Sequence, residues 1–235
     1  MITFNVLFFS EYPIDQQLYL EETLFHFSRE NWLLINQGAA FPTVVMGVSR
    51  KKEEDLYLSR CLDSALPIWR RFTGGGTVVV DQQTLFISWI VQQRDCYVGR
   101  NSQKLMEWTY MRYRSFFSKS AFTLCENDYL LEGRKCGGNA QYIRLESWLH
   151  HTSFLWNYSP ELMSHLRIPV KQPAYRNNRS HTQFLTTLSH HTPLNFSQWV
   201  TRAREKLAEQ FILQERELSS LSYPSLKHFR TTRVS

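Results

Sequence analysis

The chain has 235 residues, of which 43% are hydrophobic and 14% aromatic, and its formal net charge at pH 7 is +6. This length and apolar share support a sizeable core, and no apolar run is long enough to span a bilayer. The first nine residues lack the features of a signal peptide and predict a strand. The four cysteines form no CxxC pair, which argues against a zinc site and a disulfide framework and favours a reducing, cytoplasmic compartment.

The charge is unevenly distributed along the chain. Residues 1–64 carry 5 basic and 9 acidic side chains, whereas residues 65–235 carry 22 basic and 12 acidic ones. The net +10 of the second part attracts nucleotides, nucleic acid or an acidic protein. Because no nucleic-acid-binding motif is present, we expect a nucleotide and an acidic protein partner, with no nucleic acid and no membrane. A basic surface that only confers solubility is the alternative.

The predicted elements of the first half alternate between helix and strand. Asp15 is expected to cap a helix over residues 16–27. A buried strand follows over residues 43–48, and two more strands are expected over residues 77–80 and 85–91.

The second half continues the alternation. Apolar residues at helical spacing predict a helix over residues 101–118, and two strands follow over residues 129–131 and 153–156. Asn195 and Gln198 have the spacing of a capping box before a strongly amphipathic helix. We therefore expect an α+β fold with mixed or antiparallel sheets flanked by helices. It forms a single domain over residues 1–235 whose tail after about residue 220 is flexible.

An arginine pair runs directly into three consecutive glycines in the segment Arg70-Arg71-Phe72-Thr73-Gly74-Gly75-Gly76. Glycine lets backbone N–H groups converge on a ligand, and arginine adds forked donors suited to phosphate. The segment matches neither a P-loop nor a dinucleotide-binding fingerprint. It indicates a site for an anionic, phosphate-bearing ligand, with a tight turn as the alternative.

A second glycine-containing run, residues 133–140, places Lys135 beside Cys136. The lysine is either a functional cation or a solvated surface residue, and the cysteine is either a nucleophile or a small buried residue. Asp128 could accept a hydrogen bond from a lysine or help to hold Mg²⁺, or belong to an ordinary turn. His150 and His151 are adjacent on a predicted strand and point in opposite directions, which makes them poor joint metal ligands.

Taken in order, these pieces resemble the lipoate–protein ligase A family, within the group that also holds biotin ligases and octanoyltransferases. The family patterns RRxTGGGxVxHD, RNDL…(R/K)K(I/V)SG(N/S)A and HHGTLL are similar to residues 70–81, 126–140 and 150–155. Residues 18–24 are similar to the family's early helix, so the resemblance covers roughly residues 1–220.

The resemblance implies the biotin/lipoate protein ligase catalytic fold and a two-step reaction. ATP and Mg²⁺ would convert lipoate to lipoyl-AMP and pyrophosphate. A lysine of an apo lipoyl domain, in an E2 subunit of a 2-oxoacid dehydrogenase or in the glycine cleavage H protein, would then take the lipoyl group and release AMP. Such chemistry rests on positioning and charge stabilisation and requires no enzyme nucleophile.

The resemblance also implies roles for individual residues. Lys135 would be the catalytic cation, shared by both substrates, and no protein ligand to a metal is implied. ATP would be bound by Arg71, Gly76, Thr77, Val78 and Val79. Lipoate would be bound by Arg70, Thr73, Gly74, Gly75, Gly138, Asn139, His151 and Ser153. Supporting positions would be Asp81, Asn127 and Asp128.

The chain departs from the family pattern at several points. Val80 stands where the pattern has histidine, residues 50–52 replace a glutamine–asparagine pair, and residues 83–84 replace Gly-Asn. The chain stops where many relatives add a small C-terminal domain, so we expect the catalytic domain alone, with a separate accessory subunit left open. Two alternatives remain: an octanoyl or lipoyl acyltransferase working through a thioester on Cys125 or Cys136, and an inactive paralogue that binds lipoate or a lipoyl domain.

Overall fold

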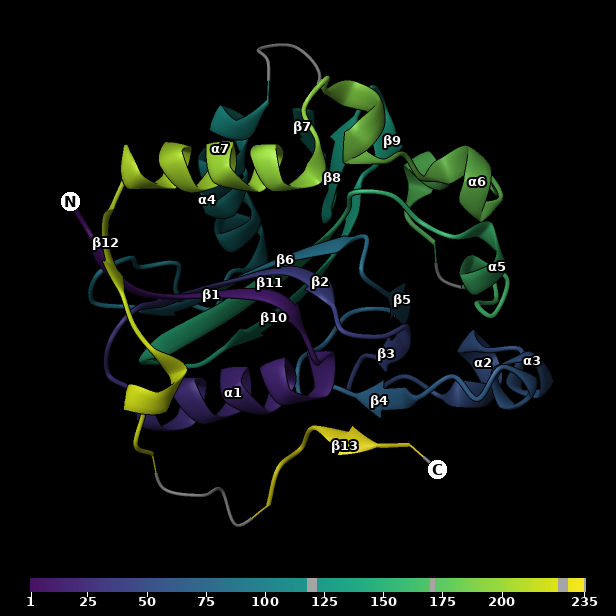
Figure 1. Ribbon diagram of the computed structural model, residues 1–235, viewed down its shortest axis with the longest axis horizontal. Helices are drawn as coiled ribbons and strands as arrows, with labels where there is room; N and C mark the ends of the chain where they lie inside the picture. Colours follow the sequence, from purple (N-terminus) through teal and green to yellow (C-terminus); the bar gives the residue numbers. More distant parts are fainter. Residues whose placement is uncertain (118–121, 170–171, 224–227, 235) are drawn as a thin grey trace.

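A six-stranded mixed sheet runs through the centre of the structure in the order β10-β11-β6-β2-β1-β12 (Figure 1). The computed structural model describes residues 1–117, 122–169, 172–223 and 228–234. Strand β1 is parallel to β2 and β12, whereas β6, β10 and β11 are antiparallel to their neighbours. The strands of this sheet are β1 (Thr3–Tyr12), β2 (Trp32–Ala39), β6 (Thr84–Gln92), β10 (Gly137–Ile143), β11 (Ser147–Leu155) and β12 (Ile212–Glu215).

Two smaller sheets lie beside the central one. The first has the order β13-β4-β3-β5 and the second the order β7-β8-β9. Their strands are β3 (Thr43–Met46), β4 (Ile68–Arg70), β5 (Val78–Val80), β7 (Phe122–Cys125), β8 (Asp128–Leu131), β9 (Arg134–Lys135) and β13 (Thr232–Arg233).

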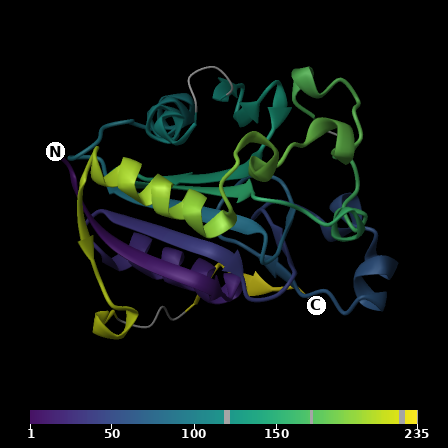
Figure 2. The same cartoon turned by 45° about the horizontal axis from the view of Figure 1, so that its top comes forward.

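Helices cover both faces of the central sheet (Figure 2). Helix α1 lies on one face, and α4 and α7 lie on the other. The helices are α1 (Ile14–Phe27), α2 (Lys52–Asp55), α3 (Leu58–Asp63), α4 (Ser102–Tyr113), α5 (Pro160–Met163), α6 (His181–Phe184) and α7 (Phe196–Ala208). Short 3₁₀ turns are η1 (Arg114–Phe116), η2 (Ala174–Arg176), η3 (Leu188–His191) and η4 (Leu218–Ser220).

The core has two sides because successive residues of a strand point to opposite faces of the sheet. On β6, Trp89 packs in the aromatic cluster under α4 and α7, whereas Ile90 packs with Phe25 of α1. Every residue of β6 is buried. The side chains of this central strand therefore pack against the helices on both faces of the sheet.

The expected α+β fold with mixed sheets and flanking helices is confirmed. The expected strands over residues 77–80 and 85–91 are present as β5 and β6, but they belong to different sheets. The expected helix over residues 101–118 ends at Tyr113 and passes into η1, and residue 118 lies outside the described residues.

Two local predictions need correction. Asp15 is not the cap of α1: the helix begins at Ile14 after Pro13, and Asp15 lies in the first turn, where its charge favours the helix N-terminus. Strand β3 ends at Met46 rather than at residue 48. The reason is that Gly47 N–H and Val48 N–H donate to the carbonyl oxygens of Gly76 and Thr73, at 3.2 and 3.0 Å.

Residues 224–227 and 235 of the predicted flexible tail lie outside the described residues. Within the tail, β13 is antiparallel to β4, and the carboxylate of Glu22 accepts the backbone N–H groups of Arg230 and Thr231, at 2.8 and 3.0 Å. No helix among residues 1–117, 122–169, 172–223 and 228–234 combines the length and apolar character needed to cross a membrane.

The predicted capping box of α7 is confirmed: the Asn195 side chain accepts from Gln198 N–H, and the Gln198 side chain accepts from Asn195 N–H. We predict that Asn195→Ala lowers the free energy of unfolding by about 1 kcal/mol, because a helix N–H loses its acceptor. Urea denaturation measures the change. Asn195→Asp, which keeps an acceptor, is the control. An alanine variant as stable as wild type would contradict the assignment.

Candidate active site

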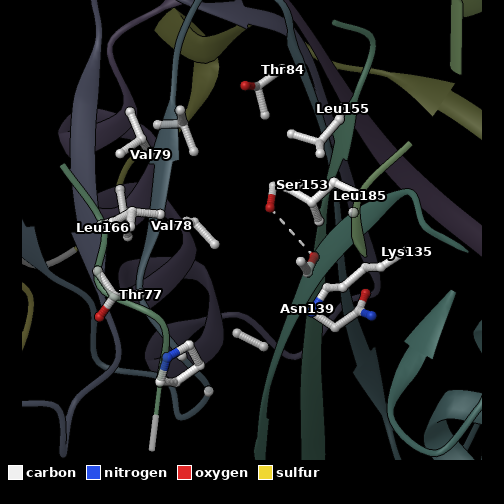
Figure 3. Close-up of a pocket in the computed structure, with 18 of the residues that line it drawn as sticks. Thr77, Val78, Val79, Thr84, Lys135, Asn139, Ser153, Leu155, Leu166 and Leu185 are labelled. Atoms are coloured by element: carbon white, nitrogen blue, oxygen red, sulfur yellow. Dashed lines mark hydrogen bonds between the residues drawn. The ribbon is translucent and has the colours of Figure 1, made fainter. Parts of the chain in front are cut away.

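A cavity of about 340 Å³ lies where the central sheet meets the two smaller sheets. Figure 3 shows Thr77, Val78 and Val79 on one wall. It shows Lys135, Asn139, Ser153, Leu155 and Leu185 on the opposite wall. Helix α1 and the segment between β11 and α6 supply further lining residues. The walls are largely apolar, and the charged groups sit at a few fixed points.

The structure brings together twelve of the sequence-predicted site residues around this cavity: Arg71, Gly75, Gly76, Thr77, Val78, Val79, Asp128, Lys135, Gly138, Asn139, His151 and Ser153. Motifs that are about 60 residues apart in the sequence thus meet at one site. Their meeting depends on β10 and β11, which are antiparallel neighbours with Gly138 opposite Ser153 and Ala140 opposite His151.

The Arg71 side chain is buried and holds the arginine–glycine segment (residues 70–76) in shape. Its Nη2 donates to the carbonyl oxygens of Gly74 and Gly76, at 2.7 and 2.9 Å, and its Nη1 donates to that of Val45, at 3.2 Å. Burial lowers the pKa of Arg71 to about 10, and the charge of Glu21 opposes this shift. The guanidinium therefore stays charged at neutral pH.

The glycines of this segment meet different surroundings. Gly75 has a φ of +97°, and a Cβ there would lie 2.7 Å from Arg71 Nη2 and 3.0 Å from the Asn139 carbonyl oxygen. A Cβ on Gly76 would meet no atom within 4 Å. Gly75 is therefore required by the fold of the chain, whereas the space beside Gly76 is open to a ligand.

Lys135 lies on β9 and forms an ion pair with Asp128, in which Nζ is 2.6 Å from Oδ1. The hydroxyl of Tyr175 donates to the other carboxylate oxygen of Asp128, at 2.7 Å. Burial and the nearby Asp128 charge raise the pKa of Tyr175, so the phenol keeps its proton. The ion pair with Asp128 holds the ammonium in place. Because the Lys135 side chain is 23% exposed, a ligand in the cavity can still reach it.

His150 and His151 do point in opposite directions, as the sequence predicts. His150 is fully buried in contact with Tyr129, and burial lowers its pKa to about 3. His151 lines the cavity, and its Nδ1 lies 2.8 Å from Oε2 of Glu21, a fully buried residue of α1. Glu21 also accepts from Ser88 Oγ and Gln17 Nε2, at 2.6 and 2.9 Å. Sequence reasoning assigned Glu21 only to the early helix and missed this contact.

A second group that the sequence did not reveal lies at the edge of the cavity. Arg50 forms an ion pair with Asp55, and the hydroxyl of Thr77 donates to the same carboxylate. Burial opposes ionisation of Asp55, but the hydrogen bonds from Arg50 and Thr77 hold its pKa below the usual range. Arg50 belongs to the charged run that replaces the family's Gln-Asn pair, and this departure is the one signal that could have pointed to it.

Five sequence-predicted residues are not among those that line the cavity: Arg70, Thr73, Gly74, Asp81 and Asn127. Each instead serves the surrounding backbone or is buried. Arg70 donates to main-chain carbonyls of residues 47–50. Asp81 accepts from Gln83 N–H in the turn before β6, at 2.8 Å. The carbonyl of Asn127 accepts from Asn139 Nδ2, at 3.1 Å.

The two cysteines near the site do not face the cavity. Cys136 is fully buried, and its thiol donates to the carbonyl oxygen of Tyr129, at 3.3 Å. Burial raises the pKa of Cys136, which disfavours the nucleophilic thiolate. Within the described part of the chain, no three His, Cys, Asp or Glu side chains gather in a group that could hold a metal ion.

The fold and the cavity together define an α+β domain in which cations and apolar side chains line one cavity. The chain belongs to the family of the lipoyl protein ligase A/B catalytic domain, whose model matches residues 13–212. This confirms the resemblance drawn from the motifs.

Three known proteins illustrate the similarity. A lipoate-protein ligase A bound with ATP has 15% identity and a TM-score of 0.70, covering 92% of this chain and 88% of its own. A bipartite lipoate protein ligase from Thermoplasma acidophilum, studied with its E2 lipoyl domain, has 16% identity and a TM-score of 0.74, covering 92% and 87%. At these identities the similarity is one of fold.

The third is a curated relative from Plasmodium falciparum, named an inactive lipoate–protein ligase 2. It is 24% identical over 247 aligned positions, which cover 78% of this chain and 64% of that protein. The chain thus matches less than two thirds of the length of this relative.

Gly75 and Gly76 offer a matched pair of substitutions. We predict that Gly75→Ala lowers the free energy of unfolding by at least about 1–2 kcal/mol, because the residue has positive φ and no room for a Cβ. Gly76→Ala should leave the free energy of unfolding within about 0.5 kcal/mol of wild type. Chemical denaturation of both variants checks this. Equal destabilisation by the two substitutions would be inconsistent with the geometry described for this segment.

Proposed function

We propose that the protein is a lipoate–protein ligase that activates lipoate with ATP and transfers the lipoyl group to a lysine of a lipoyl domain. The observation that carries the proposal is the position of Lys135. Its ammonium is held by Asp128 at the wall of a cavity that also contains Gly76, Thr77 and apolar side chains. A fixed cation there can stabilise charge on a phosphate and on an acyl oxygen in turn.

In the first step, a carboxylate oxygen of lipoate attacks the α-phosphorus of ATP, and the bond to the bridging oxygen breaks. Pyrophosphate leaves, and lipoyl-AMP remains. The backbone from Gly76 to Val79 and the cation of Lys135 would hold the phosphates, and the buried guanidinium of Arg71 would keep the segment in the required shape. The similarity to a ligase solved with ATP supports a nucleotide at this site.

In the second step, the amine of the acceptor lysine attacks the acyl carbon, and the bond to the phosphate oxygen of AMP breaks. AMP leaves with the electron pair, and the amine proton is released to solvent. Lys135 would stabilise the acyl oxygen, while Gly138, Ser153 and His151 would line the acyl chain. Positioning supplies most of the rate enhancement in such a reaction.

An apo lipoyl domain is the acceptor that fits the proposal. The net +10 over residues 65–235 favours an acidic partner, and a protein of similar fold was studied with its E2 lipoyl domain. That relative is bipartite, which supports a separate accessory subunit here. The four free cysteines support a cytoplasmic setting.

Mg²⁺ would enter with the nucleotide. The cavity carboxylates Asp55 and Asp128 are already paired, with Arg50 and Lys135, and no metal-binding group of three or more side chains exists within the described residues. The ion's ligands would therefore come chiefly from the phosphates and water.

An inactive paralogue that binds lipoate or a lipoyl domain is the second candidate. Two observations favour it: Val80 replaces the histidine of the family pattern, and a relative of the chain is named inactive. A cysteine thioester mechanism receives no such support, because Cys136 is buried with a raised pKa and neither nearby cysteine lines the cavity.

We predict that Lys135→Ala slows lipoyl transfer by a factor of about 10²–10³ while the protein stays folded, because one electrostatic contact to the reacting groups is lost. The rate is measured by mass spectrometry of an apo lipoyl domain incubated with ATP, Mg²⁺ and lipoate. The control is Lys206→Ala on α7, which removes an exposed lysine paired with Glu209.

Three outcomes are informative. Wild-type transfer that Lys135→Ala slows by about this factor supports the ligase. Full activity of Lys135→Ala removes the assignment of the catalytic cation. Absence of transfer by the wild-type chain, together with binding of lipoate, favours the inactive paralogue. Cys125→Ser and Cys136→Ala should both retain transfer, and loss of transfer in either would point to the thioester mechanism.

A further inference from the structure

The segment after α5 contributes two arginines to the cavity wall, Arg167 and Arg176, that no sequence motif indicated. Arg167 has a partner in the protein, because its Nε donates to the carbonyl oxygen of Leu56, at 2.9 Å. Arg176 ends the 3₁₀ turn η2, lines the cavity, and is only 4% exposed. Its backbone N–H donates to the carbonyl oxygen of Pro173, at 3.0 Å. The 3₁₀ turn fixes the backbone of Arg176, and burial restricts the conformations of its side chain.

The guanidinium of Arg176 is oriented from two sides. Its Nε donates to the carbonyl oxygen of Arg179, at 3.1 Å, and Arg179 Nε donates in return to the carbonyl oxygen of Arg176, also at 3.1 Å. The ring of Phe184 lies 4.5 Å from the guanidinium carbon. These contacts hold the plane of the group, and none of them uses Nη2.

The terminal Nη2 of Arg176 is buried and has no hydrogen-bond partner among the residues that the structure describes. An unsatisfied buried donor is destabilising, and more so where the group is charged. Burial lowers the pKa of Arg176, although the charge of the nearby Asp128 carboxylate opposes this shift. The chain therefore holds a cation with an unused donor at the wall of a cavity, at an energetic cost.

Other cations that line the cavity have their partners within the protein. Arg71 donates to the carbonyls of residues 45, 74 and 76. Arg50 is paired with Asp55, and Lys135 with Asp128. Arg176 differs from these three because its Nη2 has no partner within the described part of the chain, as expected of a donor whose partner arrives with the ligand.

We propose that Arg176 is an anion-binding residue of this cavity and donates Nη2–H to a phosphate oxygen of the nucleotide or of the pyrophosphate released from it. The inference rests on the proposed function for the identity of the anion. A planar guanidinium suits a phosphate because its parallel N–H groups match two oxygens. A carboxylate on an acceptor protein is a poorer fit, since a rigid surface cannot readily reach a side chain this deeply buried.

Inorganic pyrophosphate is the probe that tests this assignment without requiring catalysis. Its dissociation constant is measured by isothermal titration calorimetry for the full-length wild type, Arg176→Gln and Arg176→Lys. The matched control is Arg204→Gln, which removes an arginine of α7 that is 40% exposed and paired with Glu215. Lipoate is titrated into each protein as a second ligand, and thermal unfolding verifies that each is folded.

We expect Arg176→Gln to weaken pyrophosphate binding at least tenfold, with lipoate binding unchanged. The dissociation constant of Arg176→Lys for pyrophosphate should lie between those of wild type and Arg176→Gln, because lysine keeps the positive charge but lacks the paired N–H groups of the guanidinium. Arg204→Gln should bind like wild type. Unchanged pyrophosphate binding in Arg176→Gln, equal weakening of both ligands, or absence of pyrophosphate binding by the wild type would each overturn the assignment.

The failure of this inference is distinguishable from the failure of the proposed function. If the wild type transfers the lipoyl group and Arg176→Gln binds pyrophosphate normally, the ligase assignment holds and the role of Arg176 is wrong. If the wild type binds pyrophosphate through Arg176 but transfers no lipoyl group, the anion site holds and the ligase assignment is wrong.

Discussion

The buried guanidinium of Arg71 is the interaction on which the rest of the site depends. It ties the carbonyl oxygens of Gly74 and Gly76 to that of Val45, so the arginine–glycine segment is anchored to β3, the antiparallel neighbour of β5. A buried cation is costly unless its donors are satisfied, and here carbonyl groups satisfy them. The resulting turn leaves open space beside Gly76, where a phosphate can approach the backbone.

Three of the side chains that line the cavity are paired with carboxylates. Lys135 is held by Asp128, Arg50 by Asp55, and His151 by Glu21. Such pairing orients these side chains, and it also means that an anionic ligand that contacts one of them must share or displace its carboxylate. The same fold is therefore compatible with either a ligase or a binding protein. Which of the two it is depends on how readily an anionic ligand displaces these carboxylates.

Much of the architecture could be predicted from the sequence, because it rests on local patterns. The amphipathic face and capping box of α7 and the strand character of β6 follow from residue spacing alone. The glycine-rich motifs identified the family and part of the cavity wall. The cap of α1 was predicted incorrectly because Pro13 lets the helix begin one residue before Asp15.

The missed parts of the site depend on contacts between distant segments. Asp55 meets Thr77, and Glu21 meets His151, only after separate elements have packed. The motif alone does not distinguish Arg70 from Arg71. Their side chains point in different directions because they are successive residues of the chain, and they donate to the carbonyl oxygens of different residues. Arg176 lies in a polar stretch without a periodic pattern, so its burial is visible only in the structure.

The proposed reaction in this cavity couples ATP to acylation of a lysine of a lipoyl domain. The most direct measurement is mass spectrometry of an apo lipoyl domain incubated with the wild-type chain, Mg²⁺ and lipoate, with and without ATP. A ligase gives a lipoyl-sized mass gain on a single lysine that requires ATP. A gain from an octanoyl-carrier thioester without ATP, or no gain from either donor, would contradict the proposed reaction.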